Sequence, residues 1–286
     1  MASLKAIRRR ISSVQNTQKI TKAMKMVSAA KLRRAQDAAT SSRPYAEKLT
    51  AMLSNVAARV GTESHPLLQS RDEVKSIHLL LITADRGLCG GYNTNLIRKT
   101  TAFLNEHGRD RVRITFVGRR GFDFFKRRGV NIADKHINLF GGMTHELAQT
   151  LSDQLQKEFV VGETDAVYLI YNQFKSALVQ TPVAELILPL QPETEQEGVL
   201  ADYLYEPEAG QLLDRLLRQY VTVVIYRAFL EATASEHGAR MTAMDSATSN
   251  ASDMIDRLTL DMNRARQAGI TKELMEIVGG AEALKG

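Results

Sequence analysis

Cysteine, proline and tryptophan are scarce in this 286-residue sequence, which has one, six and none of them respectively. A single cysteine, Cys89, excludes an internal disulfide or a multi-cysteine metal site. Long hydrophobic runs are also absent, because no stretch approaches the ~18 apolar residues of a membrane-spanning helix. The first ten residues lack the apolar core of a signal peptide. They are basic and amphipathic, like a mitochondrial transit peptide, but the pattern continues for dozens of residues and predicts mature structure.

Acidic residues are nearly missing from the first sixty positions. The segment contains two acids, Asp37 and Glu47, and thirteen lysines and arginines, so its charge is +11. The rest of the chain then carries −5, which gives the net charge of +6. Such a segment favours phosphate, an anionic lipid surface or an acidic protein. Only one aromatic residue, Tyr45, lies among these charges. This weakens the case for single-stranded nucleic acid, which binds through interleaved aromatics, and we expect no nucleic-acid partner.

The sequence contains no recognisable set of catalytic residues. The six histidines are scattered without ligand spacing, so we expect no metal and no cofactor. A glycine-rich loop, Ile82 to Asn93 (I-T-A-D-R-G-L-C-G-G-Y-N), follows a strand pattern, as phosphate loops do, but neither nucleotide-binding glycine motif is present. We interpret it as a tight turn between strand and helix. Cys89 lies at a possible helix start, which could lower its pKa, but no histidine and acid accompany it.

Helix-forming residues dominate both ends of the chain. Residues 2–60 contain no glycine and one proline, Pro44, which should kink or interrupt the helix. Apolar residues recur every three or four positions from Leu4 to Val14, and the seam is predicted to resume, displaced, at Ile20, Met24 and Val27. From Leu213 to Ala265, thirteen of sixteen positions at three-four spacing are apolar; the exceptions are Arg227, His237 and Thr248. A second stripe follows from Ile270 to Leu284, so we expect a helix of ~70 residues from Gly210, roughly 105 Å long.

The middle of the chain has a different period. Short apolar runs at 76–83, 111–117, 130–137, 165–172 and 177–190 alternate with helical patterns at 93–107, 122–127 and 144–160. Alternating strands and helices predict an open, mostly parallel α/β sheet. A helix as long as the C-terminal one needs a partner for its seam, and the N-terminal helix is available. The predicted fold class is therefore α/β: a long antiparallel coiled coil of residues 1–60 with 209–286, and an inserted Rossmann-like domain at 75–190.

Three segments of the chain resemble one family, the gamma subunit of the F-type ATP synthase. They are I-S-S-V-Q-N-T-Q-K-I-T-K-A-M-K-M-V-S-A-A-K-L (11–32), D-R-G-L-C-G-G-Y-N (85–93) and A-R-Q-A-G-I-T-K-E-L-M-E-I-V-G-G-A (265–281). The shorter stretch D-Y-L-Y-E-P (202–207) fits too. The resemblance extends over essentially the whole chain, in order.

The resemblance implies a central rotor shaft without an active site, which couples proton-driven rotation of the c ring to nucleotide sites in a ring of alpha and beta subunits. It places Met24 and Lys25 near an acidic loop of beta, and Arg266 and Gln267 near a catching loop of beta. Contact with the c ring and the epsilon subunit is placed at Tyr203, Tyr205 and Glu206. It also implies a bacterial source and a peripheral location on the cytoplasmic face of the inner membrane, held only through the complex.

Two other classes share parts of this pattern: a Rossmann-like enzyme with helical arms, and a coiled-coil nucleic-acid binder. The first should carry a phosphate signature after its first strand, and the second should carry interleaved aromatics or a known module. Neither sign is present in the sequence.

The shaft interpretation predicts the behaviour of the isolated chain. Its exposed apolar stripes should make it poorly soluble, and it should not turn over ATP. Purified protein is incubated with ATP, and phosphate release is followed over time. Steady turnover that co-purifies with the chain would contradict the absence of an active site.

Overall fold

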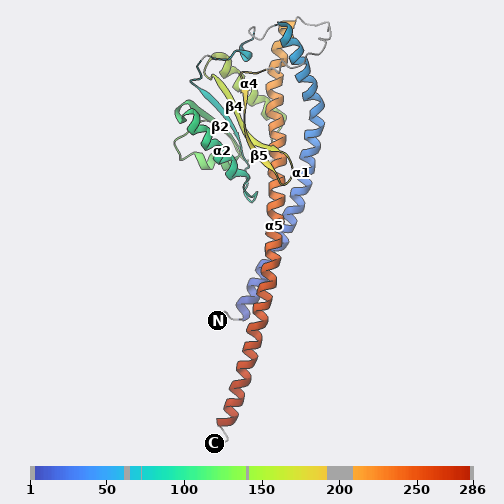
Figure 1. Ribbon diagram of the computed structural model, residues 1–286, viewed down its shortest axis with the longest axis vertical. Helices are drawn as coiled ribbons and strands as arrows, with labels where there is room; N and C mark the ends of the chain where they lie inside the picture. Colours follow the sequence, from blue (N-terminus) through green and yellow to red (C-terminus); the bar gives the residue numbers. More distant parts are fainter. Residues whose placement is uncertain (1–3, 61–64, 72, 140–141, 192–208, 284–286) are drawn as a thin grey trace. The chain divides into compact units, whose positions relative to one another are not determined.

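The computed structural model describes residues 4–60, 65–71, 73–139, 142–191 and 209–283. They divide into two compact units, one from Met1–Val27 and Met241–Gly286 and the other from Ser28–Arg240. The elements in chain order are α1 (Leu4–Val60), η2 (Pro66–Leu68), β1 (Ile77–Ile82), α2 (Tyr92–His107), η3 (Arg109–Arg111), β2 (Val112–Val117), α3 (Arg119–Phe125), β3 (Asn131–His136), α4 (His145–Val161), β4 (Ala166–Phe174), β5 (Gln180–Leu188) and α5 (Ala209–Ala283) (Figure 1).

The sheet has the order β3-β2-β1-β4-β5. Its first four strands are parallel, and β5 pairs with β4 in the antiparallel direction. Side chains alternate between the two faces of β1: Leu79 and Leu81 pack on one face, Leu80 and Ile82 on the other. The predicted fold class, with terminal helices around an inserted, mostly parallel α/β sheet, is confirmed. The boundaries 1–60, 75–190 and 209–286 stay a prediction.

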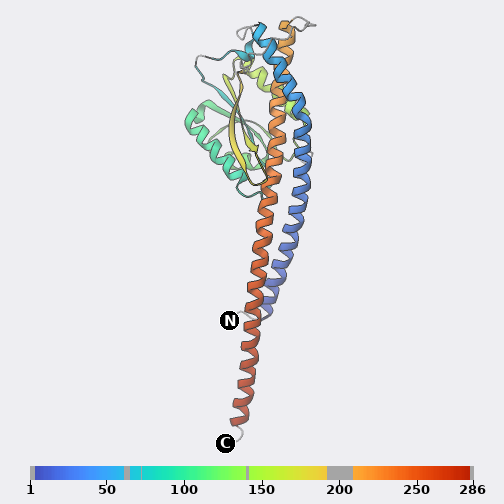
Figure 2. The same ribbon diagram turned by 45° about the vertical axis from the view of Figure 1, so that its right-hand side comes forward.

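The two faces of the sheet are covered by different helices. Residues of α2 and α3 form a core with the first face, and residues of α1, α4 and α5 form a larger core with the second. In the second unit, α1 and α5 run side by side in both views of the molecule (Figures 1 and 2). Because α5 lies between the sheet and α1, it is buried on more than one side, for example at Val221, Ile225 and Phe229. The apolar stripe predicted from Leu213 to Ala265 does not include Val221, Ile225 or Phe229.

Helix α1 differs from the prediction in two respects. It continues through Pro44 without interruption. The displaced seam is wrong, because Ile20 and Val27 are 61% and 57% exposed whereas Thr21 and Ser28 are buried. The Thr21 hydroxyl lies 2.7 Å from that of Thr248 on α5, so the two polar groups satisfy each other inside the helix pair. The seam therefore keeps its register through small hydroxyl residues that an apolar pattern cannot detect.

The described part of the chain includes no helix with the length and hydropathy needed to cross a bilayer. Residues 192–208, which contain Pro192, Gly198 and Pro207 and should connect the sheet to the C-terminal helix, lie outside the described residues.

Gly118, between β2 and α3, has a φ of +100°, and a Cβ there would lie 2.0 Å from the Thr83 carbonyl oxygen. Gly129 also has a positive φ, +62°, but a Cβ there would meet no described atom within 4 Å. We predict that Gly129→Ala costs about 1–2 kcal/mol of unfolding free energy, from backbone strain alone. Gly118→Ala should cost more than about 3 kcal/mol, because the backbone must also move.

The two variants are compared by urea unfolding at low protein concentration, with circular dichroism as the probe. Equal losses would show that the close approach of Gly118 to the end of β1 does not constrain the fold.

Candidate functional site

The loop after β1 holds the carboxyl edge of the sheet together through Asp85. Asp85 Oδ1 accepts hydrogen bonds from the backbone N–H groups of Arg119 and Asn138, both at 2.9 Å, and Oδ2 accepts one from Leu139 at 2.7 Å. This edge is where open α/β sheets bind anionic ligands, through such N–H groups. Here an aspartate carboxylate takes those donors, and its charge opposes a phosphate at the same place. The geometry agrees with a structural turn.

Cys89 in this loop is buried, at 2% exposure. Its Sγ accepts a hydrogen bond from Asn93 Nδ2 at 3.2 Å. Burial raises the pKa of the Cys89 thiol, and the Arg240 guanidinium opposes this without reversing it. The expectation that a helix start could lower this pKa is wrong, because loss of solvent outweighs the favourable charges. The thiol is therefore neutral near pH 7 and packs as part of the core.

The same loop fixes α5 to the sheet. Tyr92, at the start of α2, donates its hydroxyl hydrogen to the Ala232 carbonyl on α5 at 3.2 Å. Asn172 on β4 donates its Nδ2 hydrogen to the Tyr92 carbonyl at 3.3 Å, and its own carbonyl accepts the Ser235 hydroxyl of α5 at 2.9 Å. Asn172 and Tyr92 are nearly fully buried, as is Ser235. We call these contacts, with those of Arg240 below, the clamp.

Arg240 completes the clamp one turn further along α5. Its guanidinium bonds the Glu236 carboxylate at 2.7 Å and the Gly87 carbonyl of the loop at 3.3 Å. Gly238 faces the turn between β4 and β5, and a Cβ there would come within 3.2 Å of Ala177 Cα. The helix therefore passes close to two loops at once. Buried hydrogen bonds between rigid elements resist sliding and twisting of α5 against the sheet.

Sequence reasoning did not find the clamp. Its only sequence signals are a polar residue, Asn172, at the end of an apolar strand, and the small residues A-T-A-S-E-H-G-A of 232–239. His237, predicted to be a packed polar break in the stripe, is half-buried beside Arg240. Burial, assisted by Arg240, lowers its pKa to about 4, so the ring is neutral near pH 7.

In the other unit, α1 carries two of the predicted contact residues, Met24 and Lys25. Met24 is half-buried, and Lys25 Nζ donates a hydrogen bond to Asp245 on α5 at 2.6 Å. Both charged side chains are largely accessible, at 41% and 59%. Exposed ion pairs contribute only about 0.2–1 kcal/mol, so this one is easily exchanged. The pairing order also shows that the two helices are antiparallel, since Thr21 meets Thr248 and Lys25 meets Asp245.

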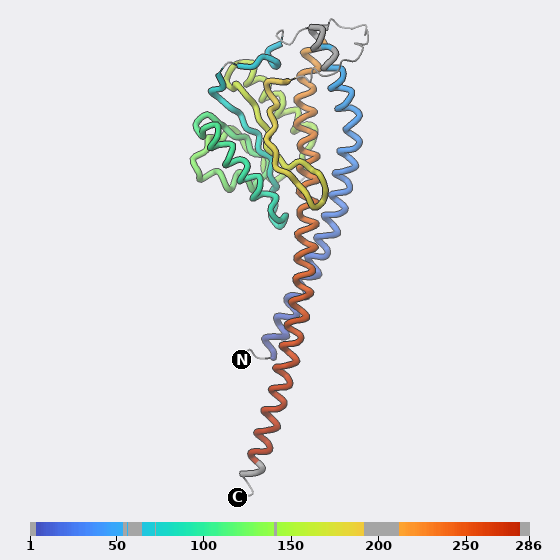
Figure 3. Tube along the Cα trace, viewed as in Figure 1, coloured from blue at the N-terminus to red at the C-terminus, as the bar shows by residue number. Residues whose placement is uncertain are grey.

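Arg266 and Gln267 are exposed on α5, about 30 Å along the helix from Asp245 at ~1.5 Å per residue. The structure therefore does not bring them together with Met24 and Lys25. Beyond them, α5 extends past the start of α1 (Figure 3), and Ile270, Leu274 and Ile277 are 56%, 57% and 72% exposed. The remaining predicted contacts, Tyr203, Tyr205 and Glu206, lie outside the described residues.

Comparison with known proteins identifies this arrangement. A family model described as ATP synthase matches residues 3–284. The chain is 52% identical over 286 residues to the ATP synthase gamma chain of Pelotomaculum thermopropionicum, and both chains are covered completely. It is 50% identical over 285 residues to the ATP synthase gamma chain of Moorella thermoacetica, again with full coverage of both. The chain belongs to the ATP synthase gamma chain family.

Solved structures agree with this family. The central stalk and c-ring structure of the Tetrahymena thermophila mitochondrial ATP synthase matches with a TM-score of 0.62 and 25% identity, over 80% of this chain and 99% of that one. A Euglena gracilis mitochondrial ATP synthase chain shares the fold, with a TM-score of 0.69 and 21% identity over 98% and 94% of the two chains. This gamma chain is a component of an ATP synthase and forms its central rotor shaft.

The clamp yields a stability prediction. Asn172→Ala leaves the Tyr92 carbonyl without its buried donor, so it should cost about 1–3 kcal/mol of unfolding free energy. The matched control is Gln173→Ala, because Gln173 is the next residue of β4 and its side chain is exposed. It should change stability by less than about 0.5 kcal/mol. Urea unfolding compares both with the parent; an Asn172→Ala variant as stable as Gln173→Ala would refute the clamp.

Proposed function

We propose that this shaft transmits rotation of a c ring to a surrounding ring of alternating alpha and beta subunits, and has no active site of its own. The observation that carries the proposal is the exposed apolar end of α5. Ile270, Leu274 and Ile277 recur at three-four spacing and stay uncovered by the described part of the chain. Exposed apolar stripes of this kind mark interaction surfaces. A ring of subunits that encloses the end of the shaft would cover them.

A second apolar stripe supports contact between α1 and beta. Ile20, Met24 and Val27 share one side of α1, and Ile20 and Val27 face away from the intrachain seam. The stripe lies beside Lys25, whose bond to Asp245 is accessible to solvent. We propose that an acidic loop of beta competes with Asp245 for Lys25 in one rotary position. Weak, exchangeable pairs suit a shaft that must leave each position again.

The other contacts rest on the family resemblance and on exposure. Arg266 and Gln267 are exposed, and we propose that they meet a catching loop of beta. Tyr203, Tyr205 and Glu206 are proposed to contact the c ring and epsilon. The complex is membrane-associated, and we propose that this chain lies on the cytoplasmic face of a bacterial inner membrane. The Asp85 carboxylate at the sheet edge and the neutral, buried Cys89 support a non-catalytic role for the α/β domain.

Met24→Lys tests the proposed contact with beta. The added charge should strengthen the ion pair with beta in one rotary position and disfavour leaving it. Proton pumping per ATP hydrolysed should therefore fall while hydrolysis stays within about twofold, or ~0.4 kcal/mol of barrier. Both rates are measured in vesicles that contain the reconstituted complex.

Met26→Lys is the matched control. Met26 is 60% exposed and points roughly 160° away from Met24 on a regular helix, so its charge should leave coupling unchanged. Equal loss of coupling in both variants, or dissociation of the complex without a coupling defect, would refute the assigned contact.

A further inference from the structure

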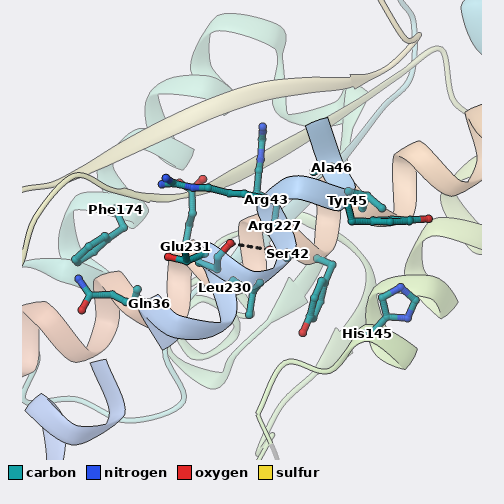
Figure 4. A pocket seen from close by; sticks show the side chains of 15 residues that line it. Gln36, Ser42, Arg43, Tyr45, Ala46, His145, Phe174, Arg227, Leu230 and Glu231 are labelled. Atoms are coloured by element: carbon teal, nitrogen blue, oxygen red, sulfur yellow. Dashed lines mark hydrogen bonds between the residues drawn. The ribbon is translucent and has the colours of Figure 1, made fainter. Parts of the chain in front are cut away.

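A pocket of about 330 Å³ lies between α1 and α5 in the second unit. Figure 4 shows Tyr45 and His145 toward one end of it, Phe174 and Gln36 toward the other, and the charged residues Arg43, Arg227 and Glu231 between them. Its volume is at the lower end of the range in which small molecules bind. None of the contacts proposed above uses it, and it is far along α1 from Met24.

Glu231 is the unusual group in this pocket. Its Oε2 is buried and has no hydrogen-bond partner among the described residues. Burial raises the pKa of the Glu231 carboxyl, and the nearby Arg227 opposes the rise without cancelling it. A buried carboxylate oxygen without a donor is destabilising. The backbone of Phe174 donates a hydrogen bond to the Glu231 carboxylate, so the group that lacks a donor is Oε2 alone.

The two arginines do not supply that donor. Arg227 Nη2 is bonded to the Glu185 carboxylate at 2.6 Å, so its charge is already balanced by another acid. Tyr171 donates its hydroxyl hydrogen to the same carboxylate at 2.9 Å, which fixes Glu185 on the sheet side. Arg43 is exposed on α1. An anion bound by Arg43 would leave Glu231 Oε2 without a donor and would add a second negative charge beside it.

The rest of the lining is apolar or aromatic. His145 and Tyr226 pack edge to face, with ring centroids 5.3 Å apart. Tyr45 hydrogen-bonds Gln219 across the two helices, and Leu230 and Ala234 line the wall formed by α5. Aromatic faces attract cations and stack with other rings. The pocket thus combines one carboxylate oxygen, Glu231 Oε2, that lacks a donor with walls that suit an aromatic ring.

We propose that this pocket binds a small aromatic amine, whose ammonium group donates to Glu231 Oε2 while its ring lies among Tyr45, His145 and Tyr226. The ligand would contact both helices: α1 in the turns around Pro44, and the neighbouring helix α5. Pro44 has no N–H, so α1 lacks one backbone hydrogen bond at this level. A bound molecule would brace this weaker point of α1 against α5.

Tyramine is the probe, since it joins a phenol to an ammonium within the size of the pocket. Equilibrium dialysis with radiolabelled tyramine at pH 7 is carried out on the purified complex of alpha, beta and this chain. Glu231→Gln should weaken binding about tenfold, because the ammonium then bonds a neutral amide oxygen in place of an ionised carboxylate. Ala39→Leu, which fills the α1 wall of the pocket, should abolish binding.

Two controls separate this site from others on the complex. Glu47→Gln removes an exposed carboxylate of α1 that does not line the pocket, and should bind tyramine like the parent. The second control probe is 4-hydroxyphenylacetate, which has a similar size but carries a carboxylate, and it should not bind with Glu231-dependent affinity. Tyramine binding that is absent, or equal in the parent, Glu231→Gln and Ala39→Leu complexes, would overturn the proposal.

Discussion

Helix α5 is 75 residues long, about 112 Å at ~1.5 Å per residue, and its apolar positions must be covered over that length. The cover changes along the helix. Between Leu213 and Ala239 the sheet and α1 bury it on opposite sides, and Val221, Phe229 and Ser235 have no more than 1% exposure. Farther along, α1 alone covers it, and past Gln267 the described chain leaves it exposed. Burial of apolar surface thus determines which part of α5 the domain covers and which part requires other subunits to cover it.

Apolar packing alone would hold α5 against the sheet without fixing its rotation, because it is not directional. The clamp adds direction. Tyr92 donates to the Ala232 carbonyl of α5, and Asn172 donates to the Tyr92 carbonyl. Arg240, on α5, bonds the Glu236 carboxylate and the Gly87 carbonyl of the loop. The four distances lie between 2.7 and 3.3 Å. The loop D-R-G-L-C-G-G-Y-N therefore has two structural roles: Asp85 ties it to the sheet edge, and Tyr92 and Gly87 tie it to the shaft. This explains why a glycine-rich loop after β1 need not bind phosphate.

The strands and long helices could be predicted because each has a simple period. Buried parallel strands such as β1 are continuous apolar runs, and the α5 stripe follows a three-four spacing. Prediction failed where burial depends on a distant partner. Thr21 is buried because Thr248 faces it, and the Asn172 carbonyl is satisfied by the hydroxyl of Ser235, which lies 63 residues later in the chain. Glu231 likewise looks like an ordinary helix carboxylate in the sequence, and only the tertiary packing shows that its Oε2 is buried without a partner among the described residues. The contacts with beta depend on subunits outside the chain, so they remain proposals.

The clamp fixes the α/β domain to the segment of α5 that it contacts, so the domain should turn with that helix. The only cysteine, Cys89, is buried, so Lys99→Cys on the exposed side of α2 gives a specific attachment point for a bead. The alpha and beta ring is fixed to a surface, and the bead is followed by microscopy while ATP is hydrolysed. We expect stepwise rotation of the bead in one direction, in fixed proportion to the ATP consumed. A bead that stays still, or wanders without relation to hydrolysis, would contradict this expectation.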